Sequence, residues 1–131
     1  MIDYQRLEVW RRAHALTLEV YRISRGFPSE ERFALTVQLR KAASSVPCNI
    51  AEGSARATDG AFAAFVGVAE GSASEAQYQL QLAHDLGYLE PGSYAAVAQE
   101  TLEIRRMLAR LRARLRRGDP GPGAPPSDHR R

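Results

Sequence analysis

Cysteine is almost absent from the 131-residue sequence: Cys48 is alone, so no internal disulfide can form. A lone thiol is typical of proteins kept in a reducing cytoplasm. No stretch approaches the roughly 18 uninterrupted apolar residues that a membrane span needs. Residues 1–6 carry acidic and polar side chains where a signal peptide needs an apolar segment. The sequence therefore predicts a cytoplasmic protein without a membrane partner.

Motifs for catalysis and for metal binding are lacking as well. The histidines His14, His84 and His129 fall on separate segments, and no Glu-x-x-His motif of the carboxylate-rich metal bundles occurs. Cys48 follows Pro47 directly, and no neighbouring side chain is an obvious base that would activate the thiol. There is no glycine-rich phosphate loop and no dinucleotide-binding fingerprint. We therefore expect no enzyme and no metal or other cofactor.

Strands are not indicated either, because β-branched and aromatic residues never alternate with polar ones along the chain. What the chain does have is alanine, leucine, arginine, glutamate and glutamine, which are good helix formers. Its length fits one domain, and 44% hydrophobic residues supply a core. The composition predicts an all-α domain.

Turn residues separate the first two predicted helices. The first extends from about Asp3, a suitable N-cap, to Arg25, before the Gly-Phe-Pro sequence at residues 26–28. Ser29 is predicted to cap the second helix, which continues to about residue 53. Pro47 lies inside this helix, where it removes one backbone hydrogen bond and favours a kink.

The last two helices follow the same kind of signals. The third is predicted to begin at Thr58 or Asp59 and to end before Gly87. The fourth follows the turn at residues 90–93 and ends at Arg117. Its apolar residues alternate spacings of three and four, as in a coiled-coil seam, at Tyr94, Val97, Thr101, Ile104, Leu108, Leu111 and Leu115.

Short connections between four helices imply antiparallel neighbours. Residues 1–117 therefore predict an antiparallel, up-down-up-down four-helix bundle. Residues 118–131 are rich in proline and glycine and predict a disordered, basic tail. Inside the third helix, Gly67 and Gly71 each cost about 1 kcal/mol relative to alanine. Such a cost predicts a closely packed neighbouring backbone, either within the bundle or on another subunit.

Positive charge is concentrated at the end of the chain. Residues 105–131 contain nine arginines and two aspartates, a net charge of +7, whereas the preceding residues carry nine basic and thirteen acidic side chains, or −4. The arginines of the predicted fourth helix are Arg105, Arg106, Arg110, Arg112, Arg114, Arg116 and Arg117. Positive charge near a helix C-terminus is favoured by the helix dipole, but seven arginines exceed that need. They predict an electrostatic contact with the phosphate backbone of RNA or DNA, sequence-tolerant and salt-sensitive.

A second candidate site lies on the predicted second helix. Asn49, Glu52, Gly53 and Arg56 are spaced by three and four residues and share one face, and Glu75 of the third helix is a further member. One interpretation is a polar site for a ligand or protein partner. The other, which we favour, is a buried hydrogen-bond network that fixes helix register or a subunit contact.

Several stretches together resemble the family of 23S rRNA intervening-sequence proteins, over about residues 4–115. They are Leu-Glu-Val-Trp-Arg-Arg-Ala-His at residues 7–14, the segment at residues 38–53 that ends in Val-Pro-Cys-Asn-Ile-Ala-Glu-Gly, Ala-Glu-Gly-Ser at residues 69–72, and Asp-Leu-Gly-Tyr-Leu at residues 85–89. The resemblance implies an antiparallel four-helix bundle that assembles as a ring, commonly a homopentamer, without known catalysis. The family is also similar to the accessory variability protein of diversity-generating retroelements, a basic pentamer that binds reverse transcriptase and nucleic acid.

The residues and the resemblance lead to two hypotheses of different classes. The first is a non-enzymatic oligomeric scaffold whose arginine-rich rim contacts RNA or DNA. The second is a protein–protein adaptor with no nucleic-acid ligand, in which the arginines meet an acidic partner surface. Competition by unrelated nucleic acid separates the two.

Overall fold

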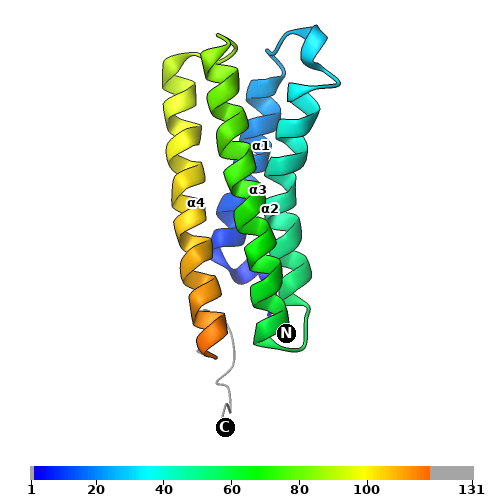
Figure 1. Ribbon diagram of the computed structural model, residues 1–131, viewed down its shortest axis with the longest axis vertical. Helices are drawn as coiled ribbons and strands as arrows, with labels where there is room; N and C mark the ends of the chain where they lie inside the picture. Colours follow the sequence, from blue (N-terminus) through cyan, green and yellow to red (C-terminus); the bar gives the residue numbers. More distant parts are fainter. Residues whose placement is uncertain (1, 119–131) are drawn as a thin grey trace.

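The chain, described here by a computed structural model over residues 2–118, is built of helices alone (Figure 1). In chain order the elements are η1 (Tyr4–Arg6), α1 (Glu8–Ser24), η2 (Ser29–Glu31), α2 (Leu35–Ser54), α3 (Asp59–Asp85) and α4 (Pro91–Arg117), where η marks a short 3-10 helix. No strand occurs in the described part of the chain, so the all-α prediction is confirmed. Gly118 ends α4 with a φ of 78°, and the rest of the predicted tail, residues 119–131, lies outside the described residues.

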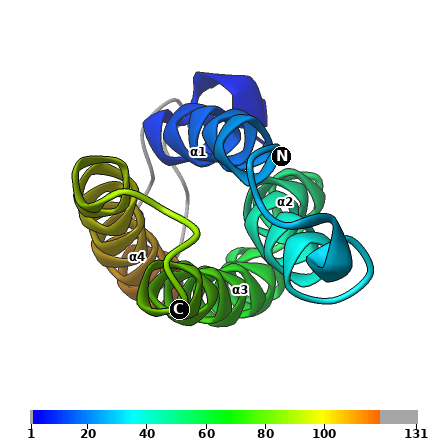
Figure 2. The same ribbon diagram turned by 90° about the horizontal axis from the view of Figure 1, so that it is seen from above.

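The four long helices run up, down, up and down, as predicted (Figure 1). Seen along the bundle axis, they follow one another around the core, and α4 returns to lie beside α1 (Figure 2). Every helix contributes large, fully buried side chains: Val20 of α1, Leu39 of α2, Leu80 of α3 and Ile104 of α4. On α4, the predicted stripe from Val97 to Leu115 is buried, since its spacing keeps one face toward the core.

The first predicted helix start is wrong. Asp3 accepts a hydrogen bond from the Gln5 backbone N–H at 3.0 Å and so caps η1. Leu7 is then extended, with φ −85° and ψ 125°, and α1 begins one residue later at Glu8. Leu7 supplies no side-chain hydrogen bond to the first turn of α1. The helix therefore begins with uncapped backbone N–H groups.

The second predicted start is also displaced. Ser29 lies in η2, and Ala34, with φ −123° and ψ −103°, separates this short turn from α2, which begins at Leu35. The third start is confirmed, because the Thr58 hydroxyl accepts a hydrogen bond from the Ala61 N–H at 3.1 Å. The difference is one of local chemistry: a side-chain cap can be identified in a sequence, whereas an unusual backbone angle between two helical turns cannot.

Pro47 lies inside α2, which continues through it as one helix. Proline has no N–H, so the carbonyl of Ala43 one turn earlier loses its helical donor. The Thr17 hydroxyl of α1 lies 3.1 Å from this carbonyl oxygen and 2.8 Å from that of Ala13. Its single proton is therefore within reach of the buried acceptor that Pro47 leaves, which links α1 to α2.

Glycines of α2 and α3 differ in what surrounds them. A Cβ at Gly53 would lie 2.7 Å from both Phe62 Cδ1 and Phe65 Cβ, so α3 approaches α2 closely there. At Gly67 the nearest atom would be Arg112 Cδ at 3.8 Å, and at Gly71 nothing lies within 4 Å. A closely packed neighbour within the bundle is therefore the wrong explanation for Gly67 and Gly71. Contact with another subunit stays a prediction.

Candidate nucleic-acid interface

The seven candidate arginines of α4 differ in the neighbouring helix that they contact. Two bond side chains of α3, two line a hollow shared with α1, and the other three are exposed. The three groups are, in that order, Arg105 and Arg112; Arg110 and Arg114; and Arg106, Arg116 and Arg117. The sequence predicted that arginines surround the buried stripe, but only contacts with the neighbouring helices distinguish the groups.

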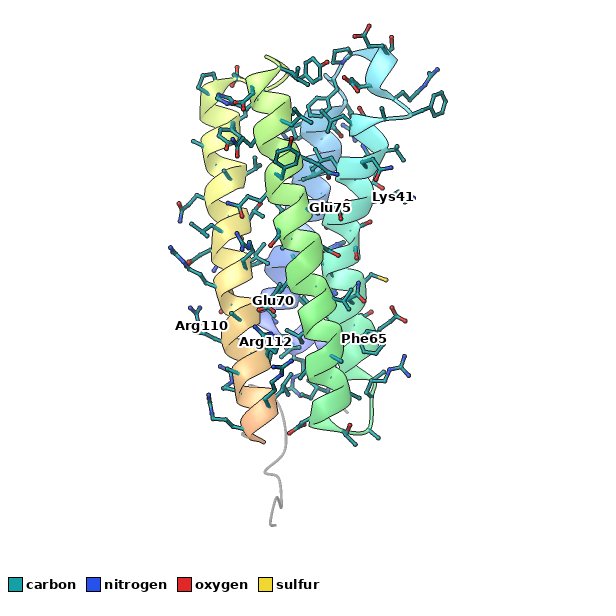
Figure 3. All side chains as sticks on the ribbon, in the orientation of Figure 1. Lys41, Phe65, Glu70, Glu75, Arg110 and Arg112 are labelled. Atoms are coloured by element: carbon teal, nitrogen blue, oxygen red, sulfur yellow. The ribbon has the colours of Figure 1, made fainter. Side chains whose placement is uncertain are left out.

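On the α3 side, both arginines are already engaged. Arg112 donates from Nε to Glu70 Oε1 at 2.6 Å and from Nη2 to Oε2 at 3.3 Å (Figure 3). The hydrogen bond with this carboxylate raises the pKa of Arg112 further above its ordinary value. Arg105 donates from Nη1 to Gln77 Oε1 at 2.7 Å. Neither guanidinium is as available to a phosphate as its position in the sequence suggested.

On the α1 side, the arginines have no such partners. Arg110 is exposed and points away from the bundle, and no hydrogen bond or ion pair joins it to residues 2–118 (Figure 3). Arg114 is half-buried, and its Nε atom is buried without a hydrogen-bond partner in the same range. Both lie at a hollow of about 190 Å³ between the start of α1 and the end of α4, the α1–α4 hollow, which is lined by Leu7, Glu8, Val9, Met107, Arg110, Leu111 and Arg114.

The remaining three candidates, Arg106, Arg116 and Arg117, are exposed to solvent. Arg106 Nη1 lies 3.8 Å from Glu103 Oε1, an ion pair at a distance too long for a hydrogen bond. Arg116 and Arg117 lie in the last turn of α4. Exposed ion pairs such as Arg106–Glu103 are weak in water, so this end of α4 keeps its positive charge.

Above the hollow, a charged bridge joins α1 to α4 that the sequence did not indicate. Arg12 donates from Nη2 to Glu100 Oε1 at 2.7 Å and from Nε to Oε2 at 2.8 Å. This hydrogen bond raises the pKa of Arg12 above its ordinary value. A separation of 88 residues carries no periodic signal, so only the returning path of α4 brings the two side chains together.

The predicted polar face of α2 begins with Asn49. Its side-chain amide donates to the Ser45 carbonyl at 2.8 Å and lies 2.9 Å from Ser45 Oγ. Ser45 Oγ is in turn 2.7 Å from Ser72 Oγ of α3. This half-buried chain of hydroxyl and amide groups joins α2 to α3 one turn away from Glu52, and it includes two serines that were not predicted.

The remaining members of that face do not join this chain of contacts. Glu52 and Arg56 are exposed, and the Arg56 guanidinium lies 4.9 Å from the centre of the Phe65 ring. Glu75 is exposed on α3, near Gln79. The structure therefore does not bring the predicted residues into one buried network, since three of them face solvent. A contact with a partner stays a prediction for them.

Glu75 instead borders an apolar groove of about 530 Å³, the α2–α3 groove. Its walls include Tyr78 and Leu86, which are large side chains exposed to solvent. Glu31 is a second acidic residue at its edge. The whole lining consists of Glu31, Ala34, Leu35, Gln38, Glu75, Tyr78, Gln79, Leu82 and Leu86.

Within residues 2–118, no three His, Cys, Asp or Glu side chains are grouped so that they could hold a metal ion. Cys48 is exposed, on a helix face with no ion pair or hydrogen bond to its side chain in that range. No helix in the described part of the chain is both long and apolar enough to cross a bilayer.

Helix order, antiparallel direction and the continuous core define the class of the protein as an up-and-down four-helix bundle. The chain belongs to the family of 23S rRNA-intervening sequence proteins, whose family model matches residues 5–110. A crystal structure of a protein of unknown function from the S23 ribosomal protein family of Bacteroides thetaiotaomicron has the same fold, with a TM-score of 0.71 and 19% identity over 79% of this chain and 96% of that one. No curated protein matches the chain. Neither similarity indicates a catalytic family.

Proposed function

We propose that the chain is a non-enzymatic, self-associating scaffold of the cytoplasm that contacts RNA or DNA through the arginines at the C-terminal end of α4. The observation that carries the proposal is the basic surface formed by Arg106, Arg110 and Arg116, of which only Arg106 forms an ion pair within residues 2–118. Guanidinium groups suit phosphate oxygens because they present several donors in a planar fork. No aromatic side chain interleaves with them, so the contact reads charge rather than base sequence.

Self-association is supported by the outer face of α3. Gly71 is open to solvent, Gly67 meets only the edge of Arg112, and Val68 and Tyr78 are exposed large side chains on the same helix. A partner backbone approaching these glycines would offset their helix-propensity cost. An assembly of copies would repeat the basic surface, so that weak single contacts add up to avid binding.

The test is a titration of nuclease-treated protein with labelled structured RNA and duplex DNA at low and moderate salt. Saturable binding that weakens steeply with salt is expected. Replacing Arg106, Arg110 and Arg116 with glutamine should reduce the log–log salt slope for duplex by up to about 0.9 for each lost phosphate contact. Helicity measured by circular dichroism controls for folding. Unchanged affinity and slope in the triple variant would contradict the assignment.

Sedimentation velocity at micromolar concentration tests the scaffold part. One assembly larger than a monomer is expected, and Gly71→Arg should dissociate it by placing a long charged side chain in the outer face of α3. A monodisperse monomer of the native chain would overturn self-association while leaving the nucleic-acid contact to be judged separately.

A protein-binding adaptor is the second candidate, and the α2–α3 groove favours it. An apolar wall with acidic residues at its edge suits an amphipathic helix with basic flanks. The adaptor predicts that excess unrelated nucleic acid leaves partner binding unchanged. The scaffold predicts that the same competitor displaces the labelled strand.

A further inference from the structure

The α1–α4 hollow contains the start of a helix. Leu7 offers no side-chain cap, and the first hydrogen bonds of α1 run from the Trp10 and Arg11 N–H groups to the Leu7 carbonyl, both at 3.1 Å. The N–H groups of residues 8 and 9 precede these bonds and are the uncapped donors of the helix. Such donors and the positive end of the helix dipole favour an anion. A helix start alone does not make a site, but this one lies beside two cations.

Those cations are Arg110 and Arg114 of α4. Arg110 is exposed at the mouth, whereas Arg114 lies deeper, with a buried Nε that meets no acceptor in residues 2–118. The buried Nε loses hydration that no acceptor in residues 2–118 replaces, whereas the rest of the guanidinium stays in contact with solvent. Glu8 is the one acidic residue that lines the hollow, and its carboxylate lies 4.0 Å from Arg12 on the other side. An anion in the hollow would pair with the Nη atoms of Arg114, which are not buried and bond no acceptor in residues 2–118.

The floor of the hollow is apolar. Leu7, Val9 and Leu111 are 2%, 6% and 3% exposed, and Met107 packs against the same core. The volume of about 190 Å³ corresponds to roughly six water molecules at about 30 Å³ each. It lies below the range of pockets for drug-sized ligands, about 300–1,000 Å³. The hollow therefore has room for one flat ring on its floor with a small anionic group toward its mouth, and not for a large cofactor.

We propose that the α1–α4 hollow binds one nucleotide of an unpaired RNA or DNA strand. The phosphate lies between Arg110, Arg114 and the N-terminus of α1, and the base contacts the apolar floor. This inference rests on the proposed nucleic-acid function and names the form of nucleic acid that the site takes.

We infer an unpaired strand because part of the hollow lies too deep for a duplex to reach. A duplex keeps its bases stacked and its phosphates on a convex surface, so that it reaches exposed Arg110 at the mouth but not the half-buried guanidinium of Arg114. A flexible strand can turn one nucleotide inward, as proteins that bind single strands commonly require. The floor has no hydrogen-bonding side chain of its own, so base identity should matter little.

The first experiment compares a labelled unpaired 12-nucleotide strand with a duplex of the same length, for three forms of the full chain. These are the native chain, the Arg110→Gln/Arg114→Gln variant, and the matched Arg105→Gln/Arg106→Gln variant, which removes the same charge from the same helix outside the hollow. We expect the hollow variant to lose about tenfold in affinity for the unpaired strand and about threefold for the duplex. The matched variant should lose about threefold for both.

A second variant and a local probe guard against loss of folding. Arg114→Lys keeps the charge but loses the planar fork of Nη donors, so it should lose affinity for the unpaired strand alone. Uridine monophosphate at millimolar concentration should shift the methyl NMR signals of Leu7, Val9 and Leu111, and leave that of Leu80 in the distant core unchanged.

The outcomes separate the two claims. If the hollow variant and the matched variant lose equal affinity for the unpaired strand, or if the methyl signals do not shift, then the α1–α4 hollow is not a nucleotide site. The proposed function is unaffected by that result. Binding of neither nucleic acid by the folded native chain overturns both. Displacement of the strand by an acidic peptide but not by unlabelled nucleic acid assigns the hollow to a protein partner and also overturns the inference.

Discussion

The contact between α2 and α3 and the contact between α1 and α4 are built in opposite ways. Between α2 and α3, Gly53 admits the rings of Phe62 and Phe65 so closely that no Cβ fits. Between α1 and α4, Arg12 and Glu100 bridge the helices and the α1–α4 hollow lies below them. Of the four pairs of neighbouring helices, α1 and α4 share the least extensive contact. The contact between α2 and α3 therefore depends on close packing, whereas the contact between α1 and α4 depends on an ion pair.

The two contacts also differ in how visible they are in the sequence: a recognisable motif forms the packing contact, but no motif marks the hollow. Gly53 ends the Asn-Ile-Ala-Glu-Gly segment, the most recognisable motif of the chain, and its role is to pack one helix against another. Such close packing tolerates little variation, since interiors are filled nearly as densely as crystals. The hollow, in contrast, is formed by residues without any recognisable motif, and its uncompensated arginine costs stability. A site that serves a ligand can retain such a cost, whereas a packing contact cannot.

The largest effect is expected from filling the closed side. Gly53→Ala places a Cβ 2.7 Å from Phe65 Cβ, which is fixed to the α3 backbone and cannot turn away. We expect a loss of about 1–3 kcal/mol in the free energy of unfolding, measured by urea denaturation. Gly60→Ala in the first turn of α3 is the matched control, because its Cβ meets nothing within 4 Å and should stabilise the helix by up to about 1 kcal/mol. Equal effects at both positions would show that propensity, not packing, determines the outcome.

The next effect concerns the link between α1 and α2. Thr17→Val keeps the shape of the side chain but removes the hydroxyl that lies 3.1 Å from the Ala43 carbonyl. We expect a loss of about 1–2 kcal/mol, since a buried acceptor beside Pro47 is left without a donor. In Thr101→Val, the control, the hydroxyl bonds only the Val97 carbonyl of its own helix, so its loss should cost less. If Thr101→Val lowers the melting temperature more than Thr17→Val does, the role assigned to Thr17 is wrong.

How far the sequence determined these regions follows from the range of each interaction. Periodicity predicted the α4 stripe from Val97 to Leu115, because helix geometry is local. The start of α3 at Thr58 or Asp59 was predicted for the same reason, and the Thr58 hydroxyl caps it. The start of α1 was wrong, because Asp3 was equally suited to cap η1. The sequence can identify a capping residue such as Asp3, but it does not show which helix that residue caps.

The candidate site was only partly predictable, because its members meet across helices. Counting arginines identified the basic end of α4, but Glu70 and Gln77, which engage Arg112 and Arg105, lie 42 and 28 residues away. Residues so far apart in the sequence show no periodic spacing that would pair them. The same limit explains why the sequence did not indicate that Leu7 and Val9, which belong to the core, also line a hollow.

A smaller effect, with opposite signs on the two sides of α4, comes from removing single arginines. Arg114→Met replaces a half-buried cation that has no acceptor at its Nε, so the free energy of unfolding should stay unchanged or rise by up to about 1 kcal/mol. Arg112→Met should lower it, because Glu70 loses both hydrogen bonds. Thermal melts at one salt concentration measure both variants. If Arg114→Met is the more destabilising of the two, then Arg114 supports the fold rather than a ligand.

The smallest effect is expected at the edge of the hollow, where Glu8 opposes any incoming anion. Glu8→Gln removes that repulsion and should strengthen binding of the unpaired strand about threefold, as expected for one screened charge near a phosphate. The first turn of α1 should lose a few tenths of a kcal/mol, since an acidic residue there favours the helix dipole. Glu75→Gln is the control, with the same change in net charge but at the α2–α3 groove. A gain in affinity in Glu8→Gln alone ties the phosphate to the hollow, whereas equal gains in both variants would mean that only the net charge of the protein is sensed.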